Sequence, residues 1–314
     1  MHKPFRIVFF GTPDFAVPSL RALLAGPDPV VGAVCQPDKP AGRGRHLAVP
    51  PVKRVALEAR VPVFQPEKLR VPEALAALTA WAPDLIVVAA YGKILPKSIL
   101  DLPRLGCMNV HGSILPKYRG AAPVQWAILR GERHTGVTIM RMNERMDAGE
   151  ILLAVETDIG LDETYGALQA RLAELGAPAL CECVARLHAG TLVGQPQSEV
   201  DVTLAPMIKK EDGCVDWHQP ATNLARLVRA FNPWPSAFSF LEGKHLKIHR
   251  AHSDAYPADA APGTVVSLRE GIHVATGAGT LVLDEVQLEG RKRLHAAEFA
   301  RGRVKVGAVL GSAP

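Results

Sequence analysis

Residues 106–151 read GCMNVHGSILPKYRGAAPVQWAILRGERHTGVTIMRMNERMDAGEI. This stretch contains an apolar run at 107–110, a helical pattern at 122–130 and a second apolar run at 137–141. Apolar runs without polar alternation are typical of strands that are buried on both faces of a sheet. The order strand, helix, strand therefore predicts a sheet that is covered by helices.

The same alternation continues on the N-terminal and C-terminal sides of this stretch. Further strands are expected at 6–10, 30–35 and 85–90, and further helices at 17–25, 51–59, 72–81 and 163–189. These elements predict an α/β fold with a Rossmann-like parallel sheet over residues 1–189. The first turn, FGTPDF at 10–15, lacks the pattern GxGxxG, so binding of NAD is not expected.

The pattern changes in the last third of the chain. Residues 190–206, GTLVGQPQSEVDVTLAP, contain turn residues without a sustained period and are predicted to be a linker. A set of short strand-like runs and one helical segment follows: 214–217, 246–249, 264–267, 272–275 and 280–283, with the helix at 221–230. A smaller β-barrel domain is therefore expected at 207–314.

Composition restricts the class of protein. The chain has 314 residues, of which 48% are hydrophobic, enough for two domains with sizeable cores. No apolar run approaches the roughly 20 residues that cross a bilayer, and the N-terminus does not resemble a signal peptide. We therefore expect a soluble, cytoplasmic protein without a membrane partner. The five cysteines are unevenly spaced and lack zinc-ligand spacing, so neither a disulfide framework nor a metal site is expected.

Positive charge is modest overall but concentrated in one segment. The net charge is +5, which permits a nucleic-acid partner without requiring one. Residues 36–60 contain six Lys and Arg against two acidic residues, in and just after a loop rich in Pro and Gly. Long cations in such a loop are able to reach a phosphate backbone, although a solubilising loop has the same composition.

Three polar residues of 106–151 are candidates for catalysis. Asn109 and His111 are two residues apart at the end of an apolar run, so both side chains point to one face of a strand. An amide donor beside an imidazole suits a reaction in which a carbonyl oxygen gains negative charge while protons move. Asp147 is a carboxylate that would orient the imidazole and favour its charged form. The set points to acyl transfer.

Each of these residues also has a purely structural interpretation. An isolated Asn-x-His is most often a satisfied structural pair. Asp147, which is followed closely by Gly149, equally fits a helix cap or a turn. The surrounding sequence decides between the two interpretations.

Several ordered motifs resemble the folate-dependent formyltransferase family. They are RIVFFGTPDFAVPSL at 6–20, QPDKPAGRGRHLAVPPVK at 36–53, MNVHGSILPKYRGAAPVQWAILRGERHTGVTIMRMNERMDAGEIL at 108–152, KKEDGCVDWHQP at 209–220 and RAFNPWPSAF at 229–238. Together they span nearly the whole chain, and the larger match is to the members of the family that act on methionyl-tRNA. An ordered set of this kind is far more specific than any one motif.

The resemblance implies the fold, the reaction and the partners. It implies an OB-like C-terminal domain that binds tRNA, and transfer of a formyl group from 10-formyltetrahydrofolate to the methionine amine of initiator methionyl-tRNA. Asn109, His111 and Asp147 would be the catalytic residues. The folate is a cosubstrate, no metal is needed, and the protein is expected to be a monomer.

The resemblance also implies a folate pocket. Ser113, Ile114, Leu115 and Pro116 match a loop that contacts folate in the family, where Leu is usual at the position of Ile114 and Ala at the position of Gly112. A rigid turn with apolar side chains suits a flat pterin. Val87 and Tyr91, in the segment 87–91, are expected to form the other wall, although they would equally fit a strand core.

Candidate tRNA contacts lie in both predicted domains. Arg43 matches a loop arginine that the family uses against the acceptor stem, and its planar fork suits phosphates and base edges. Lys39 and Arg45 flank it in the same loop. Weaker candidates in the C-terminal domain are Lys209, Lys210 and Arg229, for which a solvated face is the simpler interpretation.

Three other functions remain open from the sequence. A formyltransferase that acts on a small amine would use the same catalytic set, but it would need neither the 36–53 loop nor a basic barrel. A folate hydrolase would use water in place of the amine. A module that only binds RNA would bind tRNA without forming formylmethionine.

Overall fold

The computed structural model describes residues 3–41, 46–255 and 259–311. The chain divides into two compact units. The first contains Met1–Pro123, His134–Asp158 and Gln169–Pro206, and the second contains Val124–Arg133, Ile159–Leu168 and Met207–Pro314. The segment 190–206, which was expected to be a linker between domains, belongs to the first unit by its contacts.

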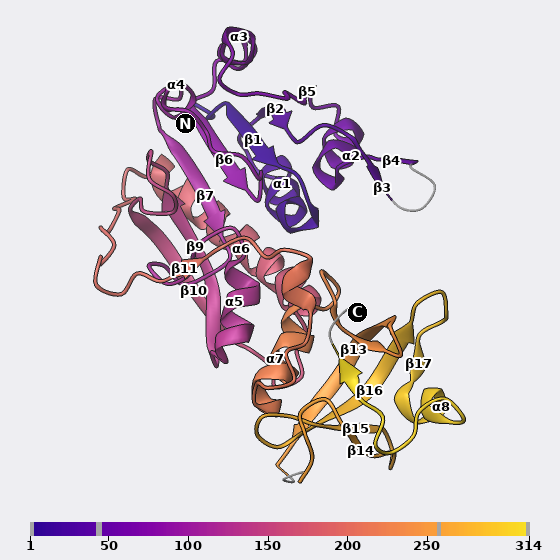
Figure 1. Ribbon diagram of the computed structural model, residues 1–314. Helices are drawn as coiled ribbons and strands as arrows, with labels where there is room; N and C mark the ends of the chain where they lie inside the picture. The colour runs from indigo at the N-terminus through magenta and orange to yellow at the C-terminus, as the bar shows by residue number, and fades with distance from the viewer. Residues whose placement is uncertain (1–2, 42–45, 256–258, 312–314) are drawn as a thin grey trace. The chain divides into compact units, whose positions relative to one another are not determined.

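The first unit is built on a seven-stranded sheet of order β10-β9-β7-β6-β1-β2-β5 (Figure 1). Its strands are β1 (Ile7–Gly11), β2 (Val30–Val34), β5 (Val63–Phe64), β6 (Leu85–Ala89), β7 (Cys107–His111), β9 (His134–Arg141) and β10 (Ile151–Asp158). The five strands β1, β2, β5, β6 and β7 are parallel, whereas β9 and β10 run antiparallel to their neighbours. The Rossmann-like fold class is confirmed, but the sheet is mixed rather than purely parallel.

Helices connect these strands or, in the case of α6, follow the last of them. They are the 3₁₀ turn η1 (Asp14–Ala16), α1 (Val17–Leu24), α2 (Pro51–Glu58), α3 (Pro72–Ala80), α4 (Lys97–Leu100) and α6 (Tyr165–His188). One face of the sheet packs its apolar side chains against Leu78 of α3 and Ile99 of α4. On the other face, Gly176 of α6 approaches Val110 and Val137 so closely that a Cβ atom would meet both.

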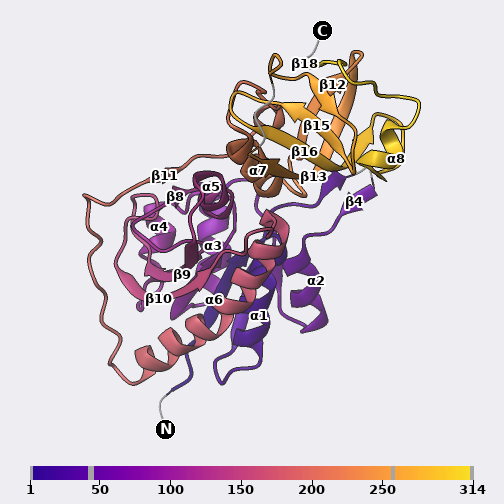
Figure 2. The ribbon, with the colours of Figure 1, turned by 90° about the horizontal axis from the view of Figure 1, so that it is seen from below.

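Two short strand pairs complete the first unit. β3 (Lys39–Ala41) pairs with β4 (His46–Ala48), and β8 (Arg119–Gly120) pairs with β11 (Leu204–Ala205). Figure 2 shows the chain after α6 running in extended form to β11. The segment 190–206 is therefore fastened to the first unit at its far end.

The second unit is a curled antiparallel sheet. Its elements are α5 (Pro123–Arg130), η2 (Glu211–Gly213), α7 (Ala221–Ala230), β12 (Ala237–Leu241), β13 (Lys244–Asp254), β14 (Val265–Ser267), β15 (Ile272–Ala275), β16 (Thr280–Leu288), β17 (Leu294–His295), α8 (Ala296–Ala300) and β18 (Leu310–Gly311). The main strand order is β14-β15-β16-β13-β12-β18. Leu224 and Val228 of α7 and Phe299 of α8 belong to the apolar core of this sheet.

One segment closes the curled sheet. Val265 of β14 donates its N–H to the carbonyl oxygen of Ala308, and Leu310 donates to the carbonyl oxygen of Gly263. Leu310 begins β18, which pairs with β12. Residues 307–311 thus join the two edges of the sheet, as a small barrel requires. The expected barrel-like second domain is confirmed.

Candidate active site

Asn109 and His111 lie at the carboxyl edge of the parallel strands. His111 is the last residue of β7, and Asn109 is in register with Val88 of β6. Because side chains two residues apart point to the same face, both lie on the face that carries Val88 and Cys107. This edge of an open α/β sheet is where ligands bind, close to the point where the strand order reverses between β1 and β6.

The two ring nitrogens of His111 face different loops. Nε2 lies 3.0 Å from the carbonyl oxygen of Tyr118, and Nδ1 lies 3.7 Å from Oδ2 of Asp147. When Nε2–H donates to Tyr118, Nδ1 of the neutral ring carries no hydrogen. A proton taken up at Nδ1 would therefore lie beside the carboxylate of Asp147.

Asp147 is held in a left-handed backbone conformation. Its φ is +48°, and its Oδ2 accepts a 2.9 Å hydrogen bond from the N–H of Gly120. At Gly149, a Cβ atom would lie 1.7 Å from the carbonyl oxygen of Arg141, so a side chain there would displace the loop. The loop between β9 and β10 thus has a fixed course that presents Asp147 to His111.

His111 and Asp147, two of the three predicted catalytic residues, are brought together, and the third, Asn109, lies two residues before His111 on the same face of β7. His111 is 5% exposed, and the side chain of Asp147 is 16% exposed, so their interaction is screened less by water than one on an open surface. Within the described part of the chain, the side-chain amide of Asn109 makes no hydrogen bond and remains available to a substrate oxygen.

The loop Ser113–Pro116 is fixed from inside. The hydroxyl of Ser113 donates to the carbonyl oxygen of Lys117 at 2.7 Å, and Leu115 is 3% exposed. Thr138 of β9 bridges the loop, because its hydroxyl donates to the carbonyl oxygen of Ser113 and accepts from the N–H of Leu115. Ser113 and Leu115 thus support the loop, whereas Ile114 and Pro116 are partly exposed.

The two residues expected to form the other wall lie on different faces of the sheet. Tyr91 belongs to the cluster that contains Val88 and packs edge-on against Phe10. Val87 is fully buried, and it points to the opposite face because it neighbours Val88 on β6. The strand ends at Ala89, and Ala90 has a φ of +44°, which interrupts the alternation. Burial raises the pKa of Tyr91 to about 12, so its phenol stays neutral.

Several residues that complete this site were missed by sequence reasoning. Thr138 was read as an ordinary strand residue, although it is fully buried between apolar neighbours, a position where a hydroxyl needs partners. The carbonyl group of Tyr118 and the N–H of Gly120 act through the backbone. Nearly every residue type carries the same backbone groups, so their role cannot be predicted from the residue types of one sequence.

The predicted tRNA-binding residues differ in whether the structure describes them and in how exposed they are. Arg43 and Arg45 lie outside the described residues. Lys39 is exposed at the start of β3. Lys209 and Lys210 are exposed just before η2. Arg229 is turned inward, because its guanidinium donates to the carbonyl oxygens of Gly160 and Glu163 and burial lowers its pKa.

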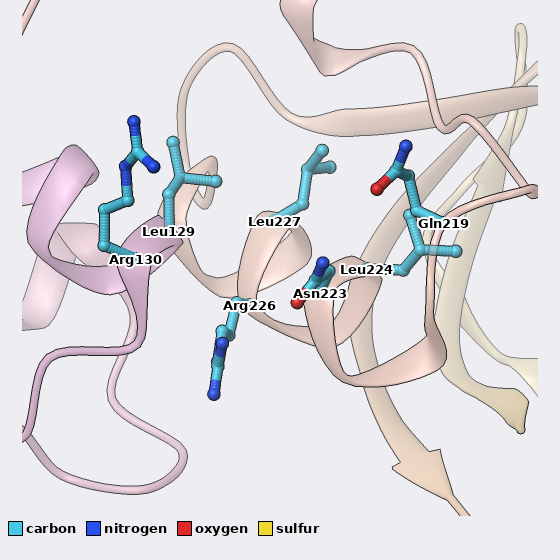
Figure 3. A pocket seen from close by; sticks show the side chains of 7 residues that line it. All are labelled: Leu129, Arg130, Gln219, Asn223, Leu224, Arg226 and Leu227. Carbon is cyan, nitrogen blue, oxygen red and sulfur yellow. The ribbon is translucent and has the colours of Figure 1, made fainter. Parts of the chain in front are cut away.

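A hollow of about 410 Å³ lies in the second unit (Figure 3). It is lined by Leu129, Arg130, Gln219, Asn223, Leu224, Arg226 and Leu227. The sticks of Arg130 and Arg226 point in different directions, so the two guanidinium groups do not converge on one point. None of the predicted catalytic residues lines this hollow.

No group of three or more His, Cys, Asp or Glu side chains in 3–41, 46–255 and 259–311 has an arrangement able to hold a metal ion. The helices of the same ranges are all too short or too polar to span a bilayer.

The chain belongs to the formyl transferase family. Residues 5–184 match the family model described as formyl transferase, and residues 207–304 match the one described as the formyl transferase C-terminal domain. The methionyl-tRNA formyltransferase of Desulfotalea psychrophila is 53% identical over 98% of this chain and 95% of its own length. The methionyl-tRNA formyltransferase of Geotalea uraniireducens is 48% identical over 98% of both chains.

Solved structures share the fold at lower identity. HypX from Aquifex aeolicus, solved with tetrahydrofolic acid, has a TM-score of 0.63 and 21% identity, over 96% of this chain and 48% of its own. An N-formyltransferase from Helicobacter canadensis, solved with folinic acid and dTDP-3-aminofucose, has a TM-score of 0.65 and 16% identity, over 89% of this chain and 98% of its own. At these identities the likeness concerns the fold alone.

Proposed function

We propose that this chain transfers the formyl group of 10-formyltetrahydrofolate to the α-amino group of methionine on initiator methionyl-tRNA. The observation that carries the proposal is the 3.7 Å approach of Asp147 to Nδ1 of His111, on the strand that also bears Asn109. This arrangement occurs in a chain whose relatives, at 48–53% identity over almost the full length, are methionyl-tRNA formyltransferases.

Each of the three residues has a distinct part in the proposed transfer. The amide of Asn109 donates to the formyl oxygen, which gains negative charge when the amine attacks. Nδ1 of His111 accepts the proton that the amine loses, since Nε2 is already bonded to Tyr118. Asp147 stabilises the imidazolium that results, and His111 then returns the proton to the departing folate nitrogen.

The residues present fit a folate donor. Ile114 and Pro116 offer partly exposed apolar surface beside the catalytic strand, on a loop that Thr138 and Ser113 hold in place. A preformed loop of this kind suits a flat pterin ring, because little ordering is needed on binding. The donor supplies the formyl group, and the chain's own residues orient it and move the protons. We therefore propose that the loop of Ser113, Ile114, Leu115 and Pro116 contacts the folate donor.

The acceptor is proposed to be held by cations of both units. Arg43 is the principal candidate, with Lys39, Arg45, Lys209 and Lys210 as further phosphate contacts. Arg229 is a weaker candidate, because its guanidinium already serves two backbone carbonyl groups. We place this reaction in the cytoplasm, where the proposed acceptor is found, and expect the chain to act as a monomer.

The test is an assay with purified protein, 10-formyltetrahydrofolate and charged initiator tRNA, with charged elongator tRNA as comparator. We expect formylmethionyl-tRNA to form on the initiator tRNA at a much higher kcat/KM. Formate release without formylmethionine would indicate a hydrolase, and tRNA binding without product would indicate an RNA-binding module. Equal or faster formylation of an amino sugar or a purine precursor would indicate a small-amine formyltransferase.

Arg43 is tested separately with a matched control. Arg43→Ala is expected to lower kcat/KM for methionyl-tRNA and to leave the KM for the folate donor unchanged, with a salt dependence shallower than that of the wild type. Arg70→Ala removes an exposed arginine elsewhere in the first unit and is expected to change neither. Equal losses for the tRNA and the folate would contradict the assignment of Arg43.

A further inference from the structure

The segment 190–206 is bonded to both loops that form the candidate active site. Gln195 exchanges two 2.8 Å backbone hydrogen bonds with Ile151, the residue that follows the Asp147 loop. Thr203 accepts the N–H of Tyr118 on its hydroxyl at 2.8 Å, and Leu204 and Ala205 pair with Arg119 and Gly120 as β11 and β8. The chain between these attachments passes the backbone of Asp147.

Gln197, between the two attachments, uses its whole hydrogen-bonding capacity. Its Oε1 accepts from Nε of Arg119 at 3.0 Å and from Nη2 at 2.8 Å. Its Nε2 donates to the carbonyl oxygens of Asp147 at 2.9 Å and of Gly149 at 2.7 Å. Two accepted and two donated bonds are the four that a glutamine amide readily makes, and they fix its orientation.

Arg119 is well suited to hold this amide. Its side chain is 6% exposed, and its third nitrogen, Nη1, lies 3.5 Å from Glu199. The planar guanidinium aligns the carbonyl group of Gln197, and so aims the amide hydrogens at the Asp147 loop. Arg119 is also next to Gly120, whose N–H holds the carboxylate of Asp147.

The Asp147 loop needs such support. Asp147 has a φ of +48°, a left-handed conformation that an aspartate adopts more readily than most residues but less readily than glycine, so surrounding contacts help to keep it. The N–H of Gly120 fixes its carboxylate, and Gln197 fixes its backbone from the other side. Loss of either contact frees the carboxylate to leave the 3.7 Å approach to His111.

We infer that Gln197 is a positioning residue of the formyl transfer, which holds Asp147 against His111 through two hydrogen bonds to the backbone of the Asp147 loop. The inference rests on the proposed function for its kinetic consequence and on the geometry alone for its structural one. The side-chain amide of Gln197 bonds to the backbone of Asp147 and Gly149 and to the guanidinium of Arg119, and to none of the three catalytic side chains among the described residues.

Gln197→Glu separates the two halves of this contact. A carboxylate keeps a charged partner for Arg119, which preserves the attachment of the segment, but it has no hydrogen to donate to the two carbonyl oxygens. We expect kcat to fall by about 10- to 100-fold, as a displaced catalytic group implies, with the KM values for folate and tRNA within twofold of wild type. Gln197→Ala is expected to lower kcat at least as much.

Gln195 provides the matched control. It is an exposed glutamine of the same segment, and its backbone rather than its side chain makes the recorded bonds. Gln195→Glu and Gln195→Ala are expected to keep wild-type kcat. A loss at position 195 as large as that at position 197 would overturn the inference, since it would show a general effect of the segment.

Two further measurements separate positioning from a general structural role. In the Asp147→Asn background, Gln197→Glu should cause little further loss of kcat, because the two substitutions act through one group. The pH dependence of kcat for Gln197→Glu should change in the same direction as that for Asp147→Asn. Full additivity of the two substitutions, or a wild-type pH profile, would overturn the inference.

Hydrogen exchange tests the geometry without reference to activity. The amides of residues 143–150 are expected to exchange faster in Gln197→Ala than in the wild type, with no change in the Gln195→Ala control. Unchanged exchange would overturn the inference even if formylation were demonstrated. Faster exchange would support the structural part of the inference, that Gln197 holds the Asp147 loop, even if the wild type failed to formylate methionyl-tRNA; that failure would count against the proposed function and the kinetic part that rests on it.

Discussion

Asp147 lies 3.7 Å from the ring of His111 although β9, the strand that leads to its loop, ends beside Met108, at the other end of β7. In the antiparallel register, His111 faces Thr138 and Met108 faces Arg141. The loop after Arg141 must therefore return along β7 to bring the carboxylate to the imidazole. This return explains why the Asp147 loop is held by contacts from Gly120 and Gln197.

Asp147→Asn removes the negative charge but keeps the size of the side chain and an acceptor for the N–H of Gly120. We expect kcat for formyl transfer to fall by about 100-fold or more, because His111 then gains a proton without a carboxylate to stabilise it. The affinity for the folate donor should change little, as measured by equilibrium binding. Asp158→Asn changes a carboxylate of an exposed His–Asp pair and serves as the control. Near-normal turnover in Asp147→Asn would reject the proposed role.

Asn109→Ala removes the proposed donor to the formyl oxygen. Loss of one such donor typically costs about 3–4 kcal/mol of transition-state stabilisation, which corresponds to a fall of kcat by about 10²- to 10³-fold. Steady-state kinetics with saturating substrates would measure it, with Asn223→Ala, an exposed asparagine of α7, as the control. An unchanged kcat would show that the amide does not contact the reacting oxygen.

The strands and helices that the sequence predicted in the first unit agree with the observed bounds to within three residues, because they combine apolar runs with prolines that mark where helices begin. Pro51 begins α2, Pro72 begins α3, and β6 is an uninterrupted run of five buried residues. The direction of β9 was not predictable, because a strand buried on both faces has the same composition whether its neighbour is parallel or antiparallel. β10 escaped prediction as an edge strand that is only partly buried.

In the second unit, the prediction of a strand at 214–217 was wrong. Only Cys214 forms a bridge there, with Phe238 of β12, a strand that sequence reasoning missed. Ser239 hides the apolar character of β12, yet it is fully buried because its hydroxyl accepts from Trp217 and donates to Gly311. A polar residue satisfied by distant partners cannot be recognised from its neighbours in sequence.

In the candidate site too, some residues could be recognised from the local sequence and others depend on distant partners. Asn109 and His111 were predictable because both lie on one strand, and Asp147 because it lies in a motif of the family. The contribution of Gln197 depends on a contact with Arg119, 78 residues away. Nothing in the residues around 197 specifies that contact.

Two partly buried histidines of β13 are expected to make the second unit sensitive to acid. Burial is the main cause that lowers the pKa of both His245 and His249, and the nearby Lys247 lowers both further. The unfolded chain, with a pKa of about 6.5, then binds protons at a higher pH than the folded unit does. The stability that the neutral rings contribute is fully present above the unfolded-state pKa of about 6.5, and it is lost as the pH falls from there through the folded-state pKa values.

His249→Gln should therefore make the pH dependence of stability shallower below about pH 6.5. The measurement is the urea midpoint of the second unit at several pH values. Hydrogen exchange of the β13 amides monitors the unfolding, and the exchange rates are corrected for their intrinsic values at each pH. His218→Gln replaces an exposed histidine of the same unit, whose side chain is 81% exposed, as the control. A slope in His249→Gln as steep as in the wild type would show that this ring does not control the transition.

The pairs His188–Asp28 and His134–Asp158 allow a comparison of burial at nearly constant chemistry. Asp28 is 4% exposed on its side chain and accepts hydrogen bonds from the N–H of Phe5 and from Nε2 of His188, on which the ring of Phe5 stacks at 3.7 Å. His134 and Asp158 are 2.7 Å apart, but their side chains are 67% and 85% exposed. Water therefore screens the pair His134–Asp158 much more than the pair His188–Asp28.

His188→Ala should consequently lower the free energy of unfolding of the first unit by about 3 kcal/mol, because it leaves a buried carboxylate with only the Phe5 amide as a recorded partner. His134→Ala should lower it by less than about 1 kcal/mol, as is usual for an exposed pair. Urea unfolding of both variants under identical conditions gives the comparison. Because Asp28 and His188 lie outside the catalytic set, kcat at low temperature should remain that of the wild type in both variants. Equal losses of stability would mean that the burial of Asp28 is compensated by contacts other than His188.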